Sequence, residues 1–183
     1  MQKRLYGPKN INMSKLIHKW KQLSLIESDI ELPNQKKVTH TTITHPGATV
    51  ILPLFSNGNL LLLKQFRPSI NDWLYELPAG TLESGELPLD CAMRELEEET
   101  HYSANHFQYI GELIPLAGFC DEVQHLYIAK ELNKTSRLTC DDDEIIEVLS
   151  LTISEVEQMI IDGKINDSKT IACLSKARLC GYI

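Results

Sequence analysis

The stretch GTLESGELPLDCAMRELEEETHY, residues 80–102, decides the fold, because its second half predicts the best-defined helix of the chain. Pro88 suits the first position of a helix, where its missing N–H and fixed φ are tolerated. Apolar side chains then recur at helical spacing and predict a single apolar face, made of Leu89, Ala92, Met93 and Leu96. We therefore expect a helix over residues 88–100.

Three glutamates of this helix, Glu95, Glu98 and Glu99, are spaced i, i+3 and i+4, so their carboxylates share one face, opposite the apolar one. A solvated acidic surface is the ordinary interpretation of such a face. However, like charges at this spacing repel, and the last turns of a helix favour cations. The Pro78-Ala79-Gly80 loop also stands at the right distance to fold back beside these acids. A hard divalent cation such as Mg²⁺, which prefers carboxylate and carbonyl oxygens, would turn the repulsion into coordination.

Strands are predicted on both sides of this helix. VTHTTIT (38–44) alternates, and the apolar runs ATVILPLF (48–55) and LLLLKQF (60–66) around a Ser-Asn-Gly turn predict a hairpin of buried strands. Further strands are expected near 107–114, 123–130 and 145–151. Two helices close the chain, one over 153–162 and one over 168–179, the latter capped by Asp167 or Ser168. This mixture predicts a layered α/β fold.

Composition narrows the class of protein. The chain has 183 residues, is 43% hydrophobic and carries a net charge of −7, which disfavours a nucleic-acid binder because phosphate backbones need a basic surface. Apolar runs long enough to span a bilayer are absent from the sequence. The five cysteines are scattered and odd in number, so we expect reduced thiols in a cytoplasmic protein. They are Cys91, Cys120, Cys140, Cys173 and Cys180.

The N-terminal part is expected to behave differently from the rest. Residues 1–13 are polar and are predicted to be a disordered tail, with Met13 as an alternative start. Residues 14–45 predict short strands around a Pro33-Asn34-Gln35 turn, with too little apolar area to form a domain alone. We expect them to pack against a partner subunit in a homodimer, while residues 46–183 form the main domain.

The decisive stretch resembles the Nudix box, G-x5-E-x7-R-E-U-x-E-E-x-G-U. Gly80 is followed after five residues by Glu86 and after seven more by Arg94-Glu95-Leu96-Glu97-Glu98-Glu99-Thr100-His101-Tyr102. Every fixed position matches except His101, which stands where the box has glycine. The resemblance, which extends over roughly residues 45–150, implies the Nudix α/β/α sandwich with a mixed sheet, preceded here by a small N-terminal β segment.

The same resemblance implies a role for each position of the box. Glu95, Glu98 and Glu99 look like ligands of Mg²⁺, for which Mn²⁺ could substitute, and the carbonyl of Ala79 looks like a further ligand. Arg94 resembles the arginine that orients the acids of the box, and Glu86 the acid that braces the loop. A carboxylate near the metal could complete deprotonation of the attacking water.

The identity of that base stays open at this stage. In similar nucleotide-sugar pyrophosphatases an acid of the loop before residue 145 faces the metals, and Glu144 aligns best, with Asp142 behind it. Glu122, in the segment GFCDE, is the competitor, because some relatives use an acid there. The acidic run 141–144 could instead be a solvated loop.

KQFRPSI and WLYELPAG, within residues 64–80, resemble the branch of the family that hydrolyses ADP-ribose and related nucleoside diphosphate sugars. This resemblance implies that Arg67 contacts the substrate's phosphates and that Glu76 is an acid of the site, although Arg67 could also be an exposed charge at a strand end. The expected reaction is Mg²⁺-dependent hydrolysis of ADP-ribose to AMP and ribose 5-phosphate. The branch's N-terminal segment exchanges between subunits of a dimer, which agrees with the prediction for residues 14–45.

Some features of the sequence leave alternatives to this substrate and to these residue roles. The branch usually has Pro-Gly after the box and this chain has Ala117-Gly118, which leaves GDP-mannose or another nucleoside diphosphate sugar open as substrate. A pyrophosphatase that acts on dinucleotides, NADH or a nucleoside triphosphate is a second hypothesis within the same chemistry. Trp20 could stack on a base, although a lone tryptophan in an amphipathic segment more often packs in a core.

His101 is predicted to adopt the left-handed conformation, which histidine tolerates better than most residues, or alternatively to act on the substrate. A non-catalytic nucleotide-sugar sensor is a further alternative, disfavoured because the box keeps all its carboxylates.

Overall fold

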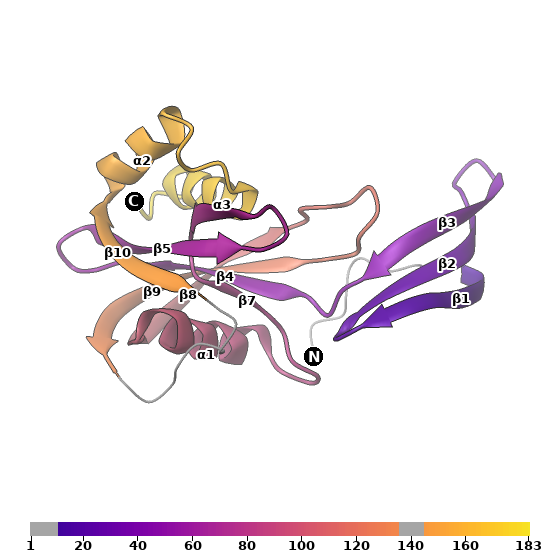
Figure 1. The fold of residues 1–183 in the computed structure, drawn as a ribbon, viewed down its shortest axis with the longest axis horizontal. Coiled ribbons are helices and arrows are strands. Elements are labelled where there is room, and N and C mark those ends of the chain that lie inside the picture. Colours follow the sequence, from indigo (N-terminus) through magenta and orange to yellow (C-terminus); the bar gives the residue numbers. More distant parts are fainter. Residues whose placement is uncertain (1–10, 136–144) are drawn as a thin grey trace. The chain divides into compact units, whose positions relative to one another are not determined.

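A computed structural model describes residues 11–135 and 145–183 (Figure 1). Within these ranges the chain forms two compact units. The first comprises the N-terminal residues up to Gly47 together with Ile114–Val123, and the second comprises Ala48–Leu113 and Gln124–Ile183.

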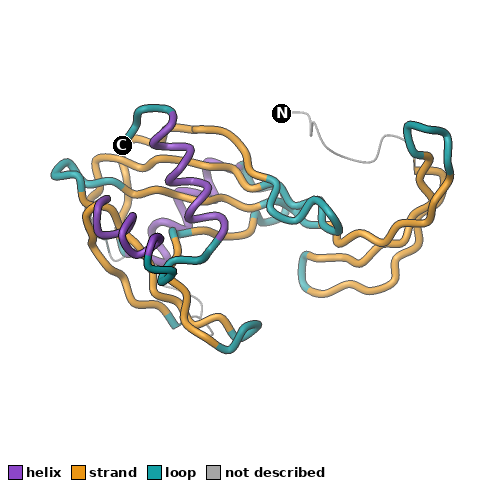
Figure 2. The backbone as a smooth tube through the Cα atoms, turned by 90° about the horizontal axis from the view of Figure 1, so that it is seen from above, coloured by secondary structure: helices purple, strands orange, loops and turns teal. Residues whose placement is uncertain are grey.

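The first unit is built of strands and loops (Figure 2). Strands β1 (Ile11–Trp20), β2 (Leu23–Glu31) and β3 (Lys37–Thr44) form an antiparallel sheet in that order. The sequence predicts strands here, but not their pairing. The end of β3 pairs with the 114–123 loop, since the Ile43 N–H donates to the carbonyl of Phe119 at 2.8 Å. Trp20 is 61% exposed, so the expectation that it packs in a core is wrong for the described residues.

The second unit contains two sheets with helices on both faces (Figure 1). One sheet has the order β7-β4-β9-β8, from β4 (Ala48–Pro53), β7 (Ala79–Thr81), β8 (Tyr102–Leu113) and β9 (Gln124–Lys134). The other has the order β10-β5-β6, from β5 (Asn59–Arg67), β6 (Asp72–Glu76) and β10 (Ile146–Thr152). The helices are α1 (Pro88–Thr100), α2 (Ile153–Ile161) and α3 (Ser168–Leu179).

The side chains of β4 alternate between two faces, and each face packs against a different layer of helices. Ile51 faces α1, where it packs with Ala92 and Leu96. Its neighbours Val50 and Leu52 belong to the larger core cluster on the other face, which includes side chains of α2 and α3. Because strand side chains alternate between faces, one buried and largely apolar strand contributes to both cores. The prediction of an α/β fold is confirmed.

The predicted hairpin of residues 48–55 and 60–66 is wrong. Strands β4 and β5 lie in different sheets and meet at an isolated bridge between Leu54 and Leu60. Both strands are buried on both faces, and such a sequence carries no alternation that would fix its pairing partners. The pairing is instead parallel between β4 and β9, which are far apart in the sequence.

Helix α1 has the predicted bounds, but its buried face differs from the predicted one. Leu89 and Met93 are exposed, whereas Cys91 and Glu99 are buried together with Ala92 and Leu96. The acidic face is therefore adjacent to the buried face and not opposite it. The loop that precedes the helix also differs, because Ala79–Thr81 is a strand paired with β4.

The C-terminal helices lie where the sequence predicts them. Asp167 caps α3 by accepting a hydrogen bond from the Thr170 N–H, and Thr152 caps α2. Among the helices of the described residues, α1 is the longest, with 13 residues, and none reaches the length and apolar content of a membrane span.

His101 ends α1 in the left-handed conformation, with φ 58° and ψ 31°, as predicted. Its N–H donates to the carbonyl of Glu97 at 3.0 Å and so terminates the helix. A β-carbon in this conformation costs on the order of 1–2 kcal/mol, whereas the extra unfolded-state freedom of glycine costs about 0.4–1 kcal/mol.

We therefore expect His101→Gly to raise the free energy of unfolding by about 0.5–1 kcal/mol and to leave kcat unchanged. Urea denaturation of both proteins measures the first effect and steady-state hydrolysis the second. A large loss of kcat without loss of stability would show that His101 acts on the substrate.

Candidate active site

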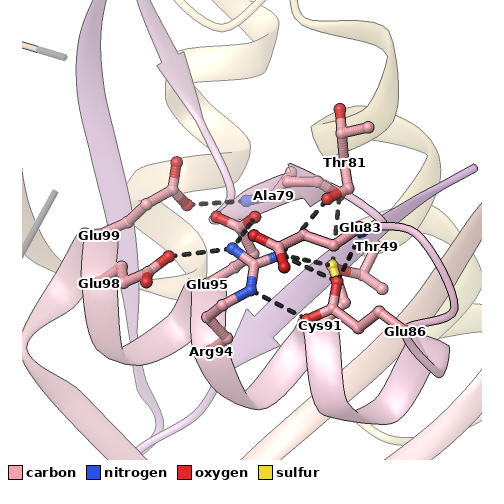
Figure 3. A network of polar contacts seen from close by, with 11 residues as sticks. Thr49, Ala79, Thr81, Glu83, Glu86, Cys91, Arg94, Glu95, Glu98 and Glu99 are labelled. Atoms are coloured by element: carbon pink, nitrogen blue, oxygen red, sulfur yellow. Dashed lines mark hydrogen bonds and ion pairs between the residues drawn. The ribbon is translucent and has the colours of Figure 1, made fainter. Parts of the chain in front are cut away.

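The acidic face of α1 lies beside strand β7, where Gly80 makes the close approach possible (Figure 3). A Cβ placed on Gly80 would overlap the carboxyl group of Glu95. Thr49 of β4 pairs with Gly80, which fixes the strand against which the helix packs. The first glycine of the box is therefore required for space: any side chain there would displace a carboxylate of the helix.

Arg94 is the centre of a polar network that organises this face (Figure 3). Its Nε and Nη2 donate to the two oxygens of Glu86 at 2.9 and 3.0 Å. Its Nη1 donates to Glu95 at 2.7 Å and to Glu98 at 3.0 Å. These bonds, above all those with Glu86, raise the pKa of Arg94 and keep it charged. The like-charge repulsion expected from the sequence is thus offset by one arginine.

Glu86 holds the loop that joins β7 to α1. Besides its bonds with Arg94, it accepts the backbone N–H of Glu83 at 2.9 Å. The hydrogen bonds from Arg94 lower the pKa of Glu86, so this carboxylate stays ionised. The geometry agrees with the bracing role that the sequence resemblance implies.

Glu99 contacts the backbone of β7 directly. Its Oε2 accepts the N–H of Ala79 at 2.9 Å, and the residue is only 3% exposed. The N–H of Ala79 therefore lies beside a buried carboxylate, so Glu99 ties the end of α1 to the start of β7.

The donor set of α1 suits a hard divalent cation. It consists of the carboxylates of Glu95, Glu98 and Glu99 next to a backbone strand, all oxygen donors. In the described part of the chain, no three acidic, imidazole or thiol groups already converge into a metal-binding cluster. Glu95 and Glu98 bind Arg94 instead. A bound cation would therefore compete with Arg94 for the oxygens of Glu95 and Glu98.

Cys91 lies inside this region, and the sequence patterns did not single it out as part of the site. Its thiol contacts the Thr49 hydroxyl at 3.4 Å and the carbonyl of Gly80 at 3.7 Å. Burial raises its pKa to about 12, so it is a neutral packing residue between helix and strand. The four described cysteines are all free thiols, as predicted, and Cys140 lies outside the described residues.

A second charged cluster joins strands β5 and β6. Arg67 forms a two-pronged ion pair with Glu76, through Nε to Oε1 at 2.7 Å and through Nη2 to Oε2 at 2.9 Å. Glu76 is 1% exposed and also binds Lys169 of α3. The structure thus brings together the two substrate-binding candidates. Lys169 gave no signal of its own in the sequence, because a single lysine on a helix is ordinarily a solvated charge.

The candidates for the base have different positions in the chain. Glu144 and Asp142 lie outside the described residues. Glu122 lies in the 114–123 loop of the first unit, as does Ala117. Next to Glu122, the carboxylate of Asp121 accepts the N–H of His45 at 2.7 Å, which ties this loop to the end of β3.

Comparison with known proteins identifies a family match and several relatives. The NUDIX domain model matches residues 44–172. The chain is 36% identical over 152 residues to the methanol dehydrogenase activator of Bacillus methanolicus, covering 82% of each protein. It is 35% identical over 160 residues to the ADP-ribose pyrophosphatase of Bacillus subtilis (strain 168), covering 87% of this chain and 86% of the relative.

One further relative and one solved structure support the same family. The GDP-mannose pyrophosphatase of Yersinia enterocolitica is 36% identical over 146 residues, covering 75% of each protein. A solved ADP compounds hydrolase shares the fold, with a TM-score of 0.80 at 18% identity over 92% of this chain and 91% of that one. The domain match, the box and these relatives together show that the chain belongs to the Nudix family of hydrolases.

Proposed function

We propose that this protein hydrolyses the pyrophosphate bond of a nucleoside diphosphate sugar, with ADP-ribose preferred and AMP and ribose 5-phosphate as products. The observation that carries the proposal is the arrangement on α1 beside β7, where Arg94 orients Glu95 and Glu98 and the Ala79 N–H holds Glu99. Relatives named for the hydrolysis of ADP-ribose and of GDP-mannose support the substrate class.

Nudix hydrolases generally use a divalent metal, and we propose Mg²⁺ here, with Mn²⁺ as a possible substitute. Glu95, Glu98, Glu99 and the Ala79 carbonyl would hold it. The bound ion would neutralise charge on the diphosphate and lower the pKa of a coordinated water. Arg94 holds the carboxylates of Glu95 and Glu98, and Glu86 holds Arg94.

For the remaining roles we propose Arg67 as the cation that contacts the diphosphate, oriented by Glu76. The general base is one of Glu144, Glu122 and Asp142, with Glu144 preferred. Replacing each by glutamine or asparagine separates them, because only loss of the base lowers kcat strongly while leaving Mg²⁺ affinity intact.

GDP-mannose is the second candidate substrate. Two observations favour it: Ala117 stands where the ADP-ribose branch usually has proline, and a GDP-mannose pyrophosphatase is among the relatives. The values of kcat/KM for ADP-ribose, GDP-mannose and NADH, measured with the same enzyme and Mg²⁺, rank the candidates. We expect ADP-ribose to lead. A lead for GDP-mannose would keep the reaction and change the substrate.

We also propose a homodimer in the cytoplasm, formed through residues 14–45. Leu16, Ile17 and Trp20 of β1 are all exposed in the single chain, and burying such residues against a second subunit is favourable. The four described free thiols suit a reducing compartment.

We expect the full-length protein to sediment as a dimer at micromolar concentration. Deletion of residues 1–45 should give a monomer or an aggregate with little activity, because each active site would lose the partner's contribution. A full-length protein that sediments as a monomer and is fully active would contradict this prediction.

A further inference from the structure

Buried Glu76 is shared by two cations that come from different parts of the chain. Arg67 stands at the end of β5, in register with Asp72, and its side chain reaches back along the β5–β6 pair to Glu76, which is in register with Leu63. Lys169 reaches the same carboxylate from the first turn of α3. A carboxylate that is 1% exposed needs such partners, because desolvation of its charge would otherwise be costly.

Lys169 is itself held firmly. Its ammonium group lies 3.1 Å from Oδ1 of Asp167, and the other oxygen of Asp167 accepts the Thr170 N–H at 2.9 Å as the helix cap. The capped end of α3 therefore determines where the lysine points. The normally flexible lysine side chain is 13% exposed here and forms a fixed link between α3 and Glu76.

The same helix end also holds the next residue of the strand. The hydroxyl of Thr170 accepts the backbone N–H of Leu77 at 2.8 Å, and Thr170 is fully buried. Leu77 leads through Pro78 to Ala79, whose N–H binds Glu99. The first turn of α3 thus supports the chain at Glu76 and Leu77, between the arginine cluster and the acidic face of α1.

The exposures show which cation a ligand can reach. The Arg67 side chain is 35% exposed, whereas Glu76 and Lys169 are 1% and 13% exposed behind it. A diphosphate can therefore contact Arg67 from solvent more readily than it can contact Lys169. Loss of Lys169 would remove a positive charge from beside Glu76 and Asp167, an unfavourable change for the binding of an anion nearby.

We propose that Lys169 is a positioning residue for substrate binding, which fixes the Glu76 carboxylate and through it the guanidinium of Arg67. This inference rests on the proposed function, in which Arg67 contacts the substrate diphosphate. It assigns a role in the site to the start of the C-terminal helix. Lys169 acts on KM through Arg67, and neither on the metal nor on the water.

The test is Lys169→Met in the full-length protein, with KM and kcat for ADP-ribose and calorimetric titration of Mg²⁺ alone. Loss of a residue that orients a binding group typically costs 10–100-fold, so we expect KM to rise on the order of 10-fold. The value of kcat and the Mg²⁺ affinity should be nearly unchanged. Lys169→Arg, which keeps a cation, should restore most of the loss.

The matched control is Lys164→Met, on an exposed lysine in the segment before α3 that pairs with Asp162 at 3.7 Å. It should leave all parameters unchanged. A double variant supplies the stronger test: in a Glu76→Gln background, Lys169→Met should change KM by less than about twofold, because coupled residues are not additive. Equal effects in both backgrounds would show that Lys169 contacts substrate directly and would overturn the proposal.

The outcomes distinguish a failure of the proposed function from a failure of the role proposed for Lys169. If the unmodified protein hydrolyses no nucleoside diphosphate sugar, the proposed function fails. If it does and KM is unchanged in Lys169→Met, only this inference fails. Should the methionine variant not fold, Lys169→Gln, which keeps a donor for Glu76, should show an intermediate rise in KM, and an unchanged KM there would equally contradict the proposal.

Discussion

Glu99→Gln is expected to lower kcat by on the order of 10²–10³-fold, the loss typical for removing one group on which electrostatic stabilisation of the transition state depends, here a ligand that would hold the metal. Mg²⁺ affinity should fall with it, because an amide oxygen is a weaker ligand for a hard cation than a carboxylate. Stability should be unchanged, since the glutamine oxygen can still accept the Ala79 N–H that Glu99 accepts at 2.9 Å.

The matched control is Glu97→Gln, the same charge change on the same helix. Glu97 occupies a variable position of the box, and its carboxylate binds the hydroxyl of Thr135 at 2.6 Å. This variant should keep its kcat and its Mg²⁺ affinity. Near-normal turnover in both Glu99→Gln and Glu98→Gln would show that α1 does not carry the metal site.

The second large effect is expected for Gly80→Ala, with an activity loss on the order of 10²-fold and little change in the free energy of unfolding. The atoms nearest to the added methyl group all belong to the Glu95 carboxyl group, the end of a flexible side chain that can move away. That movement takes the carboxylate out of its place near β7 and away from Arg94. Misplacement of a catalytic group by about 1 Å can cost 10²-fold in rate.

Gly85→Ala in the same loop should show the opposite pattern. A Cβ there meets nothing within 4 Å, but φ is +83°, which strains a residue with a side chain by about 1–2 kcal/mol. We expect a measurable loss of stability by urea denaturation with kcat retained. If Gly80→Ala kept full activity, the close fit of Gly80 and Glu95 would have no functional meaning.

The sequence predicted local elements better than their pairing. Helix α1 was predicted with its observed bounds, because Pro88 and the helical periodicity act over a few residues. The left-handed conformation of His101 also followed from its position alone. The partners of β4 and β5 could not be predicted, since their side chains are apolar on both faces and pairing depends on contacts distant in sequence, such as those between β4 and β9.

In the candidate site, too, local features were predicted and contacts between distant parts of the sequence were not. Spacing along one helix placed Glu95, Glu98 and Glu99 together, and the structure adds that Arg94 offsets their charge. Lys169 lies 93 residues from Glu76 in the sequence, and only the tertiary contact of the first turn of α3 with Glu76 and Leu77 brings the two side chains together. Buried Glu99 was also unexpected, because periodicity assigned the buried face to exposed Leu89 and Met93.

Incubation of the purified full-length protein with ADP-ribose, followed by chromatography of the products with Mg²⁺ and with a chelator, tests the central claim most directly. We expect AMP and ribose 5-phosphate in equal amounts with Mg²⁺, and neither product once the chelator has removed the metal. Product formation that is insensitive to the chelator would contradict a metal site on α1. Absence of hydrolysis with ADP-ribose, GDP-mannose and every other nucleoside diphosphate sugar would contradict the proposed reaction.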